Sequence, residues 1–270
     1  MMRKISLATV QTHLNYFFQK YNFSRLVMET VLEIIHFIGI ISFSAAGAMV
    51  AIDNETDWFG VVFLSVITCF GGGLIRDIIA GQSIGRELPV VLTDMNTEII
   101  VSISTATLIF LLAFIFKRKY VEEEKFVDQI NNVLDAFGIG VFSAAGTAAY
   151  MALDIYSPVV PMVLGMISSI GGSITRDVIL GKIPVILCKR IYALATLAGS
   201  AVYYITAKFI VVGQDYCDVV STVACVIVIV AIRMCATVFE WNMPKAIDFA
   251  KIRAESEEKN EEKATVSAEK

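Results

Sequence analysis

GGGLIRDIIAG, at residues 71–81, returns one hundred residues later as GGSITRDVILG at residues 171–181. Each copy follows a long apolar run and places an Arg-Asp pair shortly after a cluster of small residues. A charged side chain at the centre of a membrane helix costs about 2.5–3.5 kcal/mol on insertion scales, so such residues mark functional sites. The duplication therefore predicts two related half-sites in a membrane pathway or binding site.

The composition is that of an integral membrane protein. Of the 270 residues, 56% are hydrophobic and only 18% are charged, whereas an ordinary soluble domain has about 25% charged residues. Crossing a bilayer takes about 20 apolar residues, and a spanning segment must satisfy its own backbone hydrogen bonds, which favours helices. The predicted fold is an all-α integral membrane protein with seven transmembrane helices. The spans are expected at 31–52, 58–80, 98–116, 133–153, 156–180, 190–212 and 217–239.

Two further matches extend the repeat beyond the opening stretch. FSAAG at 43–47 returns at 142–146, and PVVL at 89–92 returns as PVIL at 184–187. Three anchors in the same order indicate two copies of a three-helix unit. Because each copy has an odd number of spans, the copies insert with opposite orientation, giving an inverted 3+3 repeat plus one helix.

The domain organisation follows from these repeats. We expect an N-terminal amphipathic segment that is too polar to span, and a Glu/Lys-rich cytoplasmic tail that is largely disordered. The predicted order is the amphipathic segment at 1–28, the first repeat at 29–129, the second at 130–215, the seventh helix at 216–240 and the tail at 241–270.

The consecutive glycines predict breaks in the second and fifth helices, because each glycine costs about 1 kcal/mol relative to alanine in a helix. Freed backbone carbonyls are tolerated in a membrane where they line a water-filled cavity, and they suit a small cation. The alternative interpretation is close helix packing, which small residues also promote. The predicted pore-lining residues are Gly71, Gly72, Gly73, Gly171, Gly172, Ser173, Ser44 and Ser143.

The Arg-Asp pairs are expected to support this pathway. Adjacent helix residues point about 100° apart, so an Arg is badly placed to pair with the Asp that follows it. Opposed repeats instead predict crossed pairs, Arg76 with Asp177 and Arg176 with Asp77. The alternative is that each Arg extends to the interface while each Asp caps a half-helix.

Two other charged residues in the spans have simpler expected roles. Asp135 is expected to set the start of the fourth span. Arg233, near the end of the seventh, is expected to extend toward the interface.

Basic loops predict the orientation. Lys and Arg are frequent at 117–125, 182–190 and 245–253, which all fall on one side of a seven-span protein. That side is then cytoplasmic, which places the C terminus inside and the N terminus outside. The basic residues near the N terminus favour the opposite orientation.

Several function classes are excluded by what the sequence lacks. The two histidines, His13 and His36, and five dispersed cysteines provide no metal-ligand spacing. There is no plausible nucleophile–base pair, no phosphate-binding loop and no polybasic block. We therefore expect no catalytic residues, no metal site, no cofactor and no nucleic-acid partner, and we do not expect an enzyme.

These motifs resemble the bacterial branch of the trimeric intracellular cation (TRIC) channel family, whose sequences are also described as a glycine-transporter-like membrane family. The resemblance rests on the two G-G-x-x-x-R-D copies, the Pro-Val after each, DWFG at 57–60 and Tyr192-Ala193 at the start of the sixth span. It covers about residues 30–240.

The resemblance implies a homotrimer in the bacterial inner membrane, in contact with lipids, with a pore inside each protomer. It also implies helices two and five broken at the glycines, and passive conduction of monovalent cations, potassium or sodium. The alternative from a different class is a secondary transporter for a small zwitterion such as glycine, in which Arg and Asp hold the carboxylate and the amine.

Overall fold

The computed structural model describes residues 7–80, 88–93, 96–151, 157–188, 192–214, 216–239 and 241, with side chains from Arg25 onward except at positions 91 and 188. The predicted tail at 241–270 lies almost wholly outside these residues. Seven helices among them are long and apolar enough to cross a membrane. The fold prediction of an all-α membrane protein with seven spans is confirmed.

The spanning helices follow the predicted segments closely, with two short helices after the second and third spans and one after the fifth. The spanning helices are α1 (Leu7–Ile52), α2 (Trp58–Ala80), α4 (Asn96–Ile115), α6 (Glu124–Met151), α7 (Val159–Ile179), α9 (Tyr192–Ile205) and α10 (Cys217–Val238). The short helices are α3 (Val90–Thr93), α5 (Lys117–Glu122) and α8 (Val185–Cys188), and a π-helical turn at Thr206–Ile210 extends α9.

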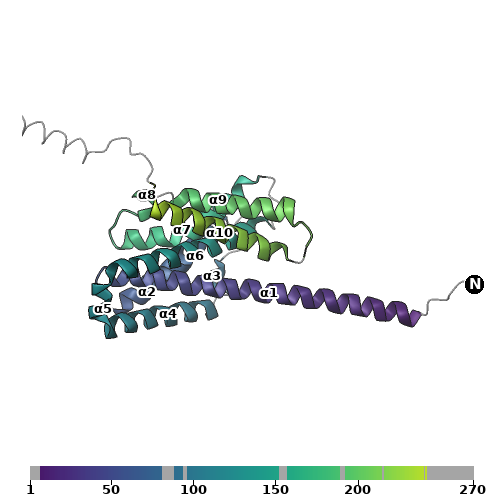
Figure 1. Cartoon of the computed structure of the whole chain (residues 1–270), viewed down its shortest axis with the longest axis horizontal. Helices are drawn as coiled ribbons and strands as arrows, with labels where there is room; N and C mark the ends of the chain where they lie inside the picture. Colours follow the sequence, from purple (N-terminus) through teal and green to yellow (C-terminus); the bar gives the residue numbers. More distant parts are fainter. Residues whose placement is uncertain are drawn as a thin grey trace, which may run out of the picture.

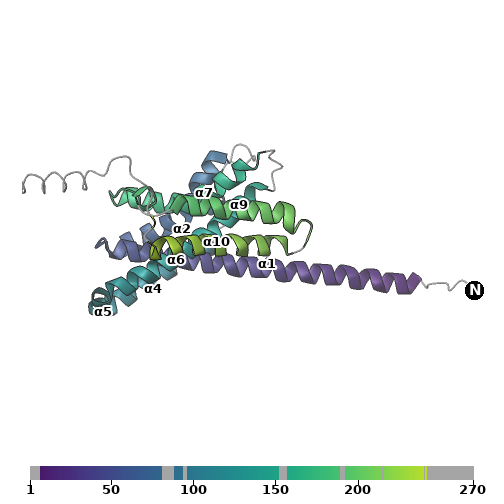
Figure 2. The same ribbon diagram turned by 45° about the horizontal axis from the view of Figure 1, so that its top comes forward.

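The helix α1 is longer than a bilayer requires. Its 46 residues make a helix about 69 Å long at about 1.5 Å per residue, whereas the hydrocarbon core is about 30 Å thick. Figures 1 and 2 show its N-terminal half projecting beyond the bundle. No helix break marks the predicted boundary at residue 28.

The helices form two three-helix units that pack on each other. In the first unit α1, α2 and α4 are mutually in contact, and in the second α6, α7 and α9 are. The units meet through α1 against α6 and α2 against α7, while α10 packs on α6 and α9. In Figure 1, α1 runs toward the end of the bundle that carries α5, and α6 runs back from it. The corresponding helices α1 and α6 are therefore antiparallel, as the inverted repeat predicts.

The repeated FSAAG segment lies where the two units meet. The rings of Phe43 and Phe142, which occupy the same position in the two copies, are stacked with centroids 5.2 Å apart and planes 8° apart. The following residues, Ser44 and Ser143, are fully buried. A stacked pair of aromatic rings at an apolar interface explains why both copies carry the same Phe.

The prediction that α2 and α7 break at the glycines is wrong. Both helices continue without interruption through the glycines and the Arg-Asp pairs. A Cβ at Gly72 would lie 2.1 Å from the backbone oxygen of Ser168, and one at Gly172 would lie 2.1 Å from that of Thr68. The glycines therefore let the two helix backbones touch where they cross, which is the close-packing alternative.

Candidate pathway and its charged cavity

Each Arg of the repeated motif binds the Asp of its own repeat, so the prediction of crossed pairs is wrong. The Nη2 atom of Arg76 lies 2.7 Å from Oδ1 of Asp77, and that of Arg176 lies 2.8 Å from Oδ1 of Asp177. In both repeats the Nε atom donates to the same oxygen. A guanidinium on a long stem folds back over one residue, which Cβ directions alone do not predict.

The second oxygen of each Asp explains the repeated Pro-Val sequence. Oδ2 of Asp77 accepts the backbone N–H of Val90 at 3.0 Å, and Oδ2 of Asp177 accepts that of Val185 at 3.0 Å. These valines are the first residues of α3 and α8, where a backbone N–H lacks a partner within the helix. The motif thus ties the end of one helix to the short helix that follows it.

Equivalent serines pair inside each repeat. Ser44 donates to Oγ of Ser102 at 2.7 Å, linking α1 to α4. The hydroxyls of Ser143 and Ser200 lie 2.7 Å apart, linking α6 to α9. Neither Ser44 nor Ser143 lines the two cavities described below, so the structure places both in contacts between helices.

Most predicted pore residues meet at the crossing of α2 and α7. Gly71, Gly72, Gly171 and Gly172 are buried there, and Gly73 is partly buried. Ser173 is 4% exposed, and its hydroxyl has no hydrogen-bond partner among the described residues. The predicted glycine set is therefore brought together, as a tight contact between backbones.

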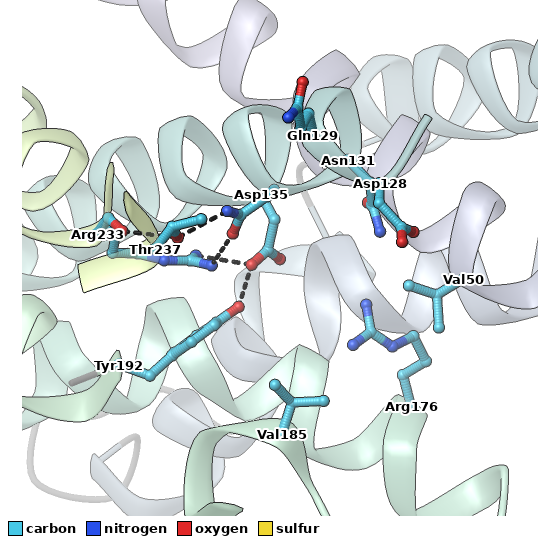
Figure 3. A pocket seen from close by; sticks show the side chains of 11 residues that line it. Val50, Asp128, Gln129, Asn131, Asp135, Arg176, Val185, Tyr192, Arg233 and Thr237 are labelled. Atoms are coloured by element: carbon cyan, nitrogen blue, oxygen red, sulfur yellow. Dashed lines mark hydrogen bonds and ion pairs between the residues drawn. The ribbon is translucent and has the colours of Figure 1, made fainter. Parts of the chain in front are cut away.

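A polar cavity of about 360 Å³ opens beside the second Arg-Asp pair. Figure 3 shows the guanidinium of Arg176 and the carboxylate of Asp135 directed into the same space. The cavity is built from α6, α7, α9 and α10, with one residue each from α1 and α8. Its lining residues are Val50, Asp128, Gln129, Asn131, Asn132, Asp135, Arg176, Val185, Tyr192, Arg233 and Thr237.

Asp135 and Arg233 form a buried ion pair on the cavity wall. Nη1 of Arg233 lies 2.7 Å from Oδ2 of Asp135, which also accepts the hydroxyl of Tyr192. Nη2 donates to Oδ1 of Asn132 at 3.0 Å, and the guanidinium carbon lies 3.8 Å from the centre of the Tyr192 ring. These contacts attach α10 to α6 and α9.

This pair corrects two predictions. Asp135 lies about three turns inside α6, which begins at Glu124, so it does not set the start of the helix. Arg233 is 6% exposed and does not extend to the interface. Asp135 in the fourth span and Arg233 in the seventh have opposite charges within apolar sequence, and this was the signal that could have paired them, because unpaired charges are rare inside membranes.

A second cavity of about 320 Å³ lies between α1, α6, α9 and α10. Its walls are mainly apolar, and its polar residues include Glu33, His36 and Asp218. Asp218 accepts the hydroxyl of Tyr203 at 3.0 Å.

Acidic residues gather near the polar cavity, where α1 ends and α6 begins. Asp53 accepts the hydroxyl of Tyr120 at 3.1 Å. Partial burial raises the pKa of Asp53, and the negative charges of Asp128 and Glu124 raise it further. Tyr120 also has a raised pKa, through burial first and through the neighbouring Asp53 charge. The hydrogen bond from Tyr120 to Asp53 joins the end of α1 to α5.

Comparison with known sequences identifies the relatives. The family described as Glycine transporter matches residues 33–115 and 132–208, one segment in each predicted repeat. A UPF0126 membrane protein of Deinococcus radiodurans is 30% identical over 191 residues, which cover 69% of this chain and 82% of the relative. The UPF0126 inner membrane protein YadS of Escherichia coli (strain K12) is 31% identical over 166 residues, covering 62% and 74%.

Solved structures show the same fold. A prokaryotic TRIC channel crystallised in 0.5 M KCl matches with a TM-score of 0.65 and 26% identity, covering 80% of this chain and all of that one. The TRIC trimeric intracellular cation channel orthologue from Rhodobacter sphaeroides matches with a TM-score of 0.64 and 26% identity, covering 78% and all of that chain. The resemblance found in the sequence is confirmed, and these relatives are membrane proteins and channels rather than enzymes. The chain is thus a multi-pass membrane protein that belongs to the UPF0126 family, described as Glycine transporter, and it has the fold of prokaryotic TRIC channels.

Proposed function

We propose that the protein is a passive channel for monovalent cations, potassium or sodium, with a conduction pathway inside each protomer. The observation that carries this proposal is a charged, polar cavity of about 360 Å³ that reaches the Arg176–Asp177 pair within an apolar bundle. Irregular or charged groups persist at membrane depth where they line a water-filled path. The structural neighbours described as cation channels support the same conclusion.

We propose that the path continues from the cavity through the interior of the protomer. Hydroxyl groups are buried throughout the bundle, and their oxygens are suitable partners for a partly dehydrated cation. We propose that the glycine crossing of α2 and α7, where the two helix backbones touch, is the point at which this path closes, and that opening requires the two helices to separate there. The residues that we assign to the path are Gly71, Gly72, Gly73, Gly171, Gly172, Ser173, Ser44 and Ser143.

The charges are compatible with cation passage. An unpaired Arg would repel a cation, but Arg76 and Arg176 are each neutralised by their own Asp. The exposed carboxylate of Asp128 at the cavity rim raises the local concentration of cations.

The assembly and orientation follow from the relatives and the loops. The Rhodobacter sphaeroides orthologue is described as trimeric, and YadS as an inner membrane protein. We therefore assign this chain to a homotrimer in the bacterial inner membrane, surrounded by lipid. From the basic loops we also propose that the N terminus lies outside and the C terminus in the cytoplasm.

The experiment is single-channel recording of purified protein in planar bilayers under potassium, sodium and chloride gradients. We expect unitary currents whose reversal potential follows the cations. Asp128→Asn should lower the conductance at low ionic strength and have less effect at high ionic strength, because salt screens an exposed charge. Glu122→Gln removes the same charge from α5, outside the cavity, and serves as the matched control.

Two results contradict the proposal. One is a reversal potential that follows chloride. The other is saturable, gradient-driven uptake of labelled glycine without unitary currents, which identifies a secondary transporter for a small zwitterion.

A further inference from the structure

A side-chain hydrogen bond joins α2 to α7 beside their glycine contact. Nη1 of Arg76 on α2 donates to Oγ of Ser168 on α7 at 3.1 Å. Ser168 is 2% exposed, and its backbone oxygen is the atom that a Cβ at Gly72 would meet. Gly72 and Arg76 are four positions apart, so they lie on the same face of α2. The backbone contact and the side-chain bond therefore act on the same residue of α7.

The bond to Ser168 is oriented by the Arg-Asp pair of the first repeat. Nε and Nη2 of Arg76 bind Oδ1 of Asp77 at 2.8 and 2.7 Å. Because the guanidinium is planar, these two contacts fix the direction in which Nη1 points. Asp77 is itself held by the backbone N–H of Val90. All three nitrogens of the Arg76 guanidinium thus have partners, and Nη1 is directed at α7.

The second repeat does not make the equivalent bond. Thr68 takes the place of Ser168, and its hydroxyl donates to the backbone oxygen of Leu64 within α2 at 2.6 Å. Nη1 of Arg176 is buried and has no hydrogen-bond partner in the part of the chain that the structure describes. The inverted repeat is therefore asymmetric at this point, because Arg76 of α2 binds α7 but Arg176 of α7 does not bind Thr68 of α2.

We propose that Arg76 and Ser168 form a latch that holds the pathway closed. This inference rests on the proposed function, in which opening requires α2 and α7 to separate at the glycine crossing. Separation breaks the bond between Arg76 and Ser168, whereas the bond of Thr68 lies within α2 and persists. Hydrogen bonds to a charged group are stronger than those between neutral groups. A bond of this kind that exists only in the closed state shifts the population toward that state.

The first test compares two variants that each remove one hydroxyl from the crossing. Ser168→Ala removes the acceptor of Arg76, and Thr68→Val, the matched control, removes the hydroxyl that bonds within α2. In single-channel recordings Ser168→Ala should raise the ratio of open to closed time roughly tenfold, with the unitary conductance and the reversal potential unchanged. Thr68→Val should leave this ratio unchanged. A purely structural role of Ser168 would lower the melting temperature without changing the ratio.

The second test measures the separation of the helices without relying on currents. Spin labels are attached to cysteines introduced at Ile78 of α2 and Val178 of α7, which are 70% and 60% exposed, in a protein whose five native cysteines are alanine. In pulsed EPR, Ser168→Ala should change the distance distribution by populating a second distance, and Thr68→Val should not. Arg76→Lys should have the same effect, and combining it with Ser168→Ala should add little, because both changes break one bond.

Three results overturn the latch. They are the same distance distribution in Ser168→Ala as in the parent protein, an unchanged ratio of open to closed time in Ser168→Ala, and equal effects of Ser168→Ala and Thr68→Val. The two proposals fail separately. Unitary currents with distances that do not respond to Ser168→Ala refute the latch alone. A parent protein without unitary currents refutes the channel, and the spin-label distances then still decide whether Ser168 holds the two helices together.

Discussion

Substituting Gly72 by alanine should destabilise the protein through a clash between two helix backbones. The new Cβ would lie 2.1 Å from the backbone oxygen of Ser168 and 3.0 Å from that of Ile167. Backbone atoms inside a helix cannot rotate away, so α2 and α7 must separate. Overpacking costs about 1–3 kcal/mol, and this contact belongs near the upper value. The higher helix propensity of alanine stabilises the folded protein by about 1 kcal/mol, so the free energy of unfolding should fall by about 2 kcal/mol in total.

The assay is thermal unfolding of purified variants in one detergent. A loss of about 2 kcal/mol corresponds to a melting temperature lower by about 4–8 °C in a chain of this size class. Gly71→Ala is the matched control, because its Cβ would lie 3.2 Å from the Cα of Gly172, which needs only a small adjustment. Gly172→Ala, with a contact of 2.1 Å to Thr68, should behave like Gly72→Ala. Equal melting temperatures for Gly71→Ala and Gly72→Ala would refute the close-crossing account.

Three further predictions concern the charged groups. Asp135→Ala should lower the unfolding free energy by about 3–5 kcal/mol, since it strands the buried Arg233, and adding Arg233→Met should recover most of the loss in the same unfolding assay. Asp177→Asn should lower the melting temperature more than Asp77→Asn, because Nη1 of Arg76 keeps Ser168 as a partner, whereas Nη1 of Arg176 has no hydrogen-bond partner in the part of the chain that the structure describes. Since the folded pKa of Asp53 is raised, stability falls as pH rises above the unfolded value of about 3.9. Asp53→Asn should therefore be more stable than the parent protein above about pH 4, and melting curves at several pH values measure this difference. A difference in stability between variant and parent that is the same at about pH 4 and about pH 7 would contradict the prediction.

The fold was predictable because its main signals are local. A long run of apolar residues in lipid forms a helix, because a helix pairs its own backbone N–H and C=O groups. Seven such runs were visible in the sequence without any contact information. The repeat was visible because the same contacts are made twice. Phe43 stacks on Phe142, and each motif Asp binds the valine that follows the repeated proline. Because a residue in one repeat has the same neighbours as its counterpart in the other, the same residue type suits both positions.

The site was only partly predictable. The glycines were correctly grouped, yet the prediction of a helix break assumed that glycine's low helix propensity would decide the local structure. Tertiary packing outweighs about 1 kcal/mol per glycine when two helix backbones can touch at the crossing. The partners of Arg76 and Arg176 were predicted wrongly for a different reason. The direction of the Cβ atom does not show how far a long, flexible Arg side chain can bend back toward the next residue.

The sequence by itself determined the membrane class, the seven spans, the inverted repeat and the family, since hydropathy and repeated motifs are properties of the chain. Only the tertiary structure decided that the glycines join two unbroken helices and that each Arg binds its own Asp. It also decided that Asp135 of α6 meets Arg233 of α10, 98 positions later, on the wall of a polar cavity. The physical reason is that these features depend on which helix faces meet, and that is set by side-chain packing between segments far apart in the chain.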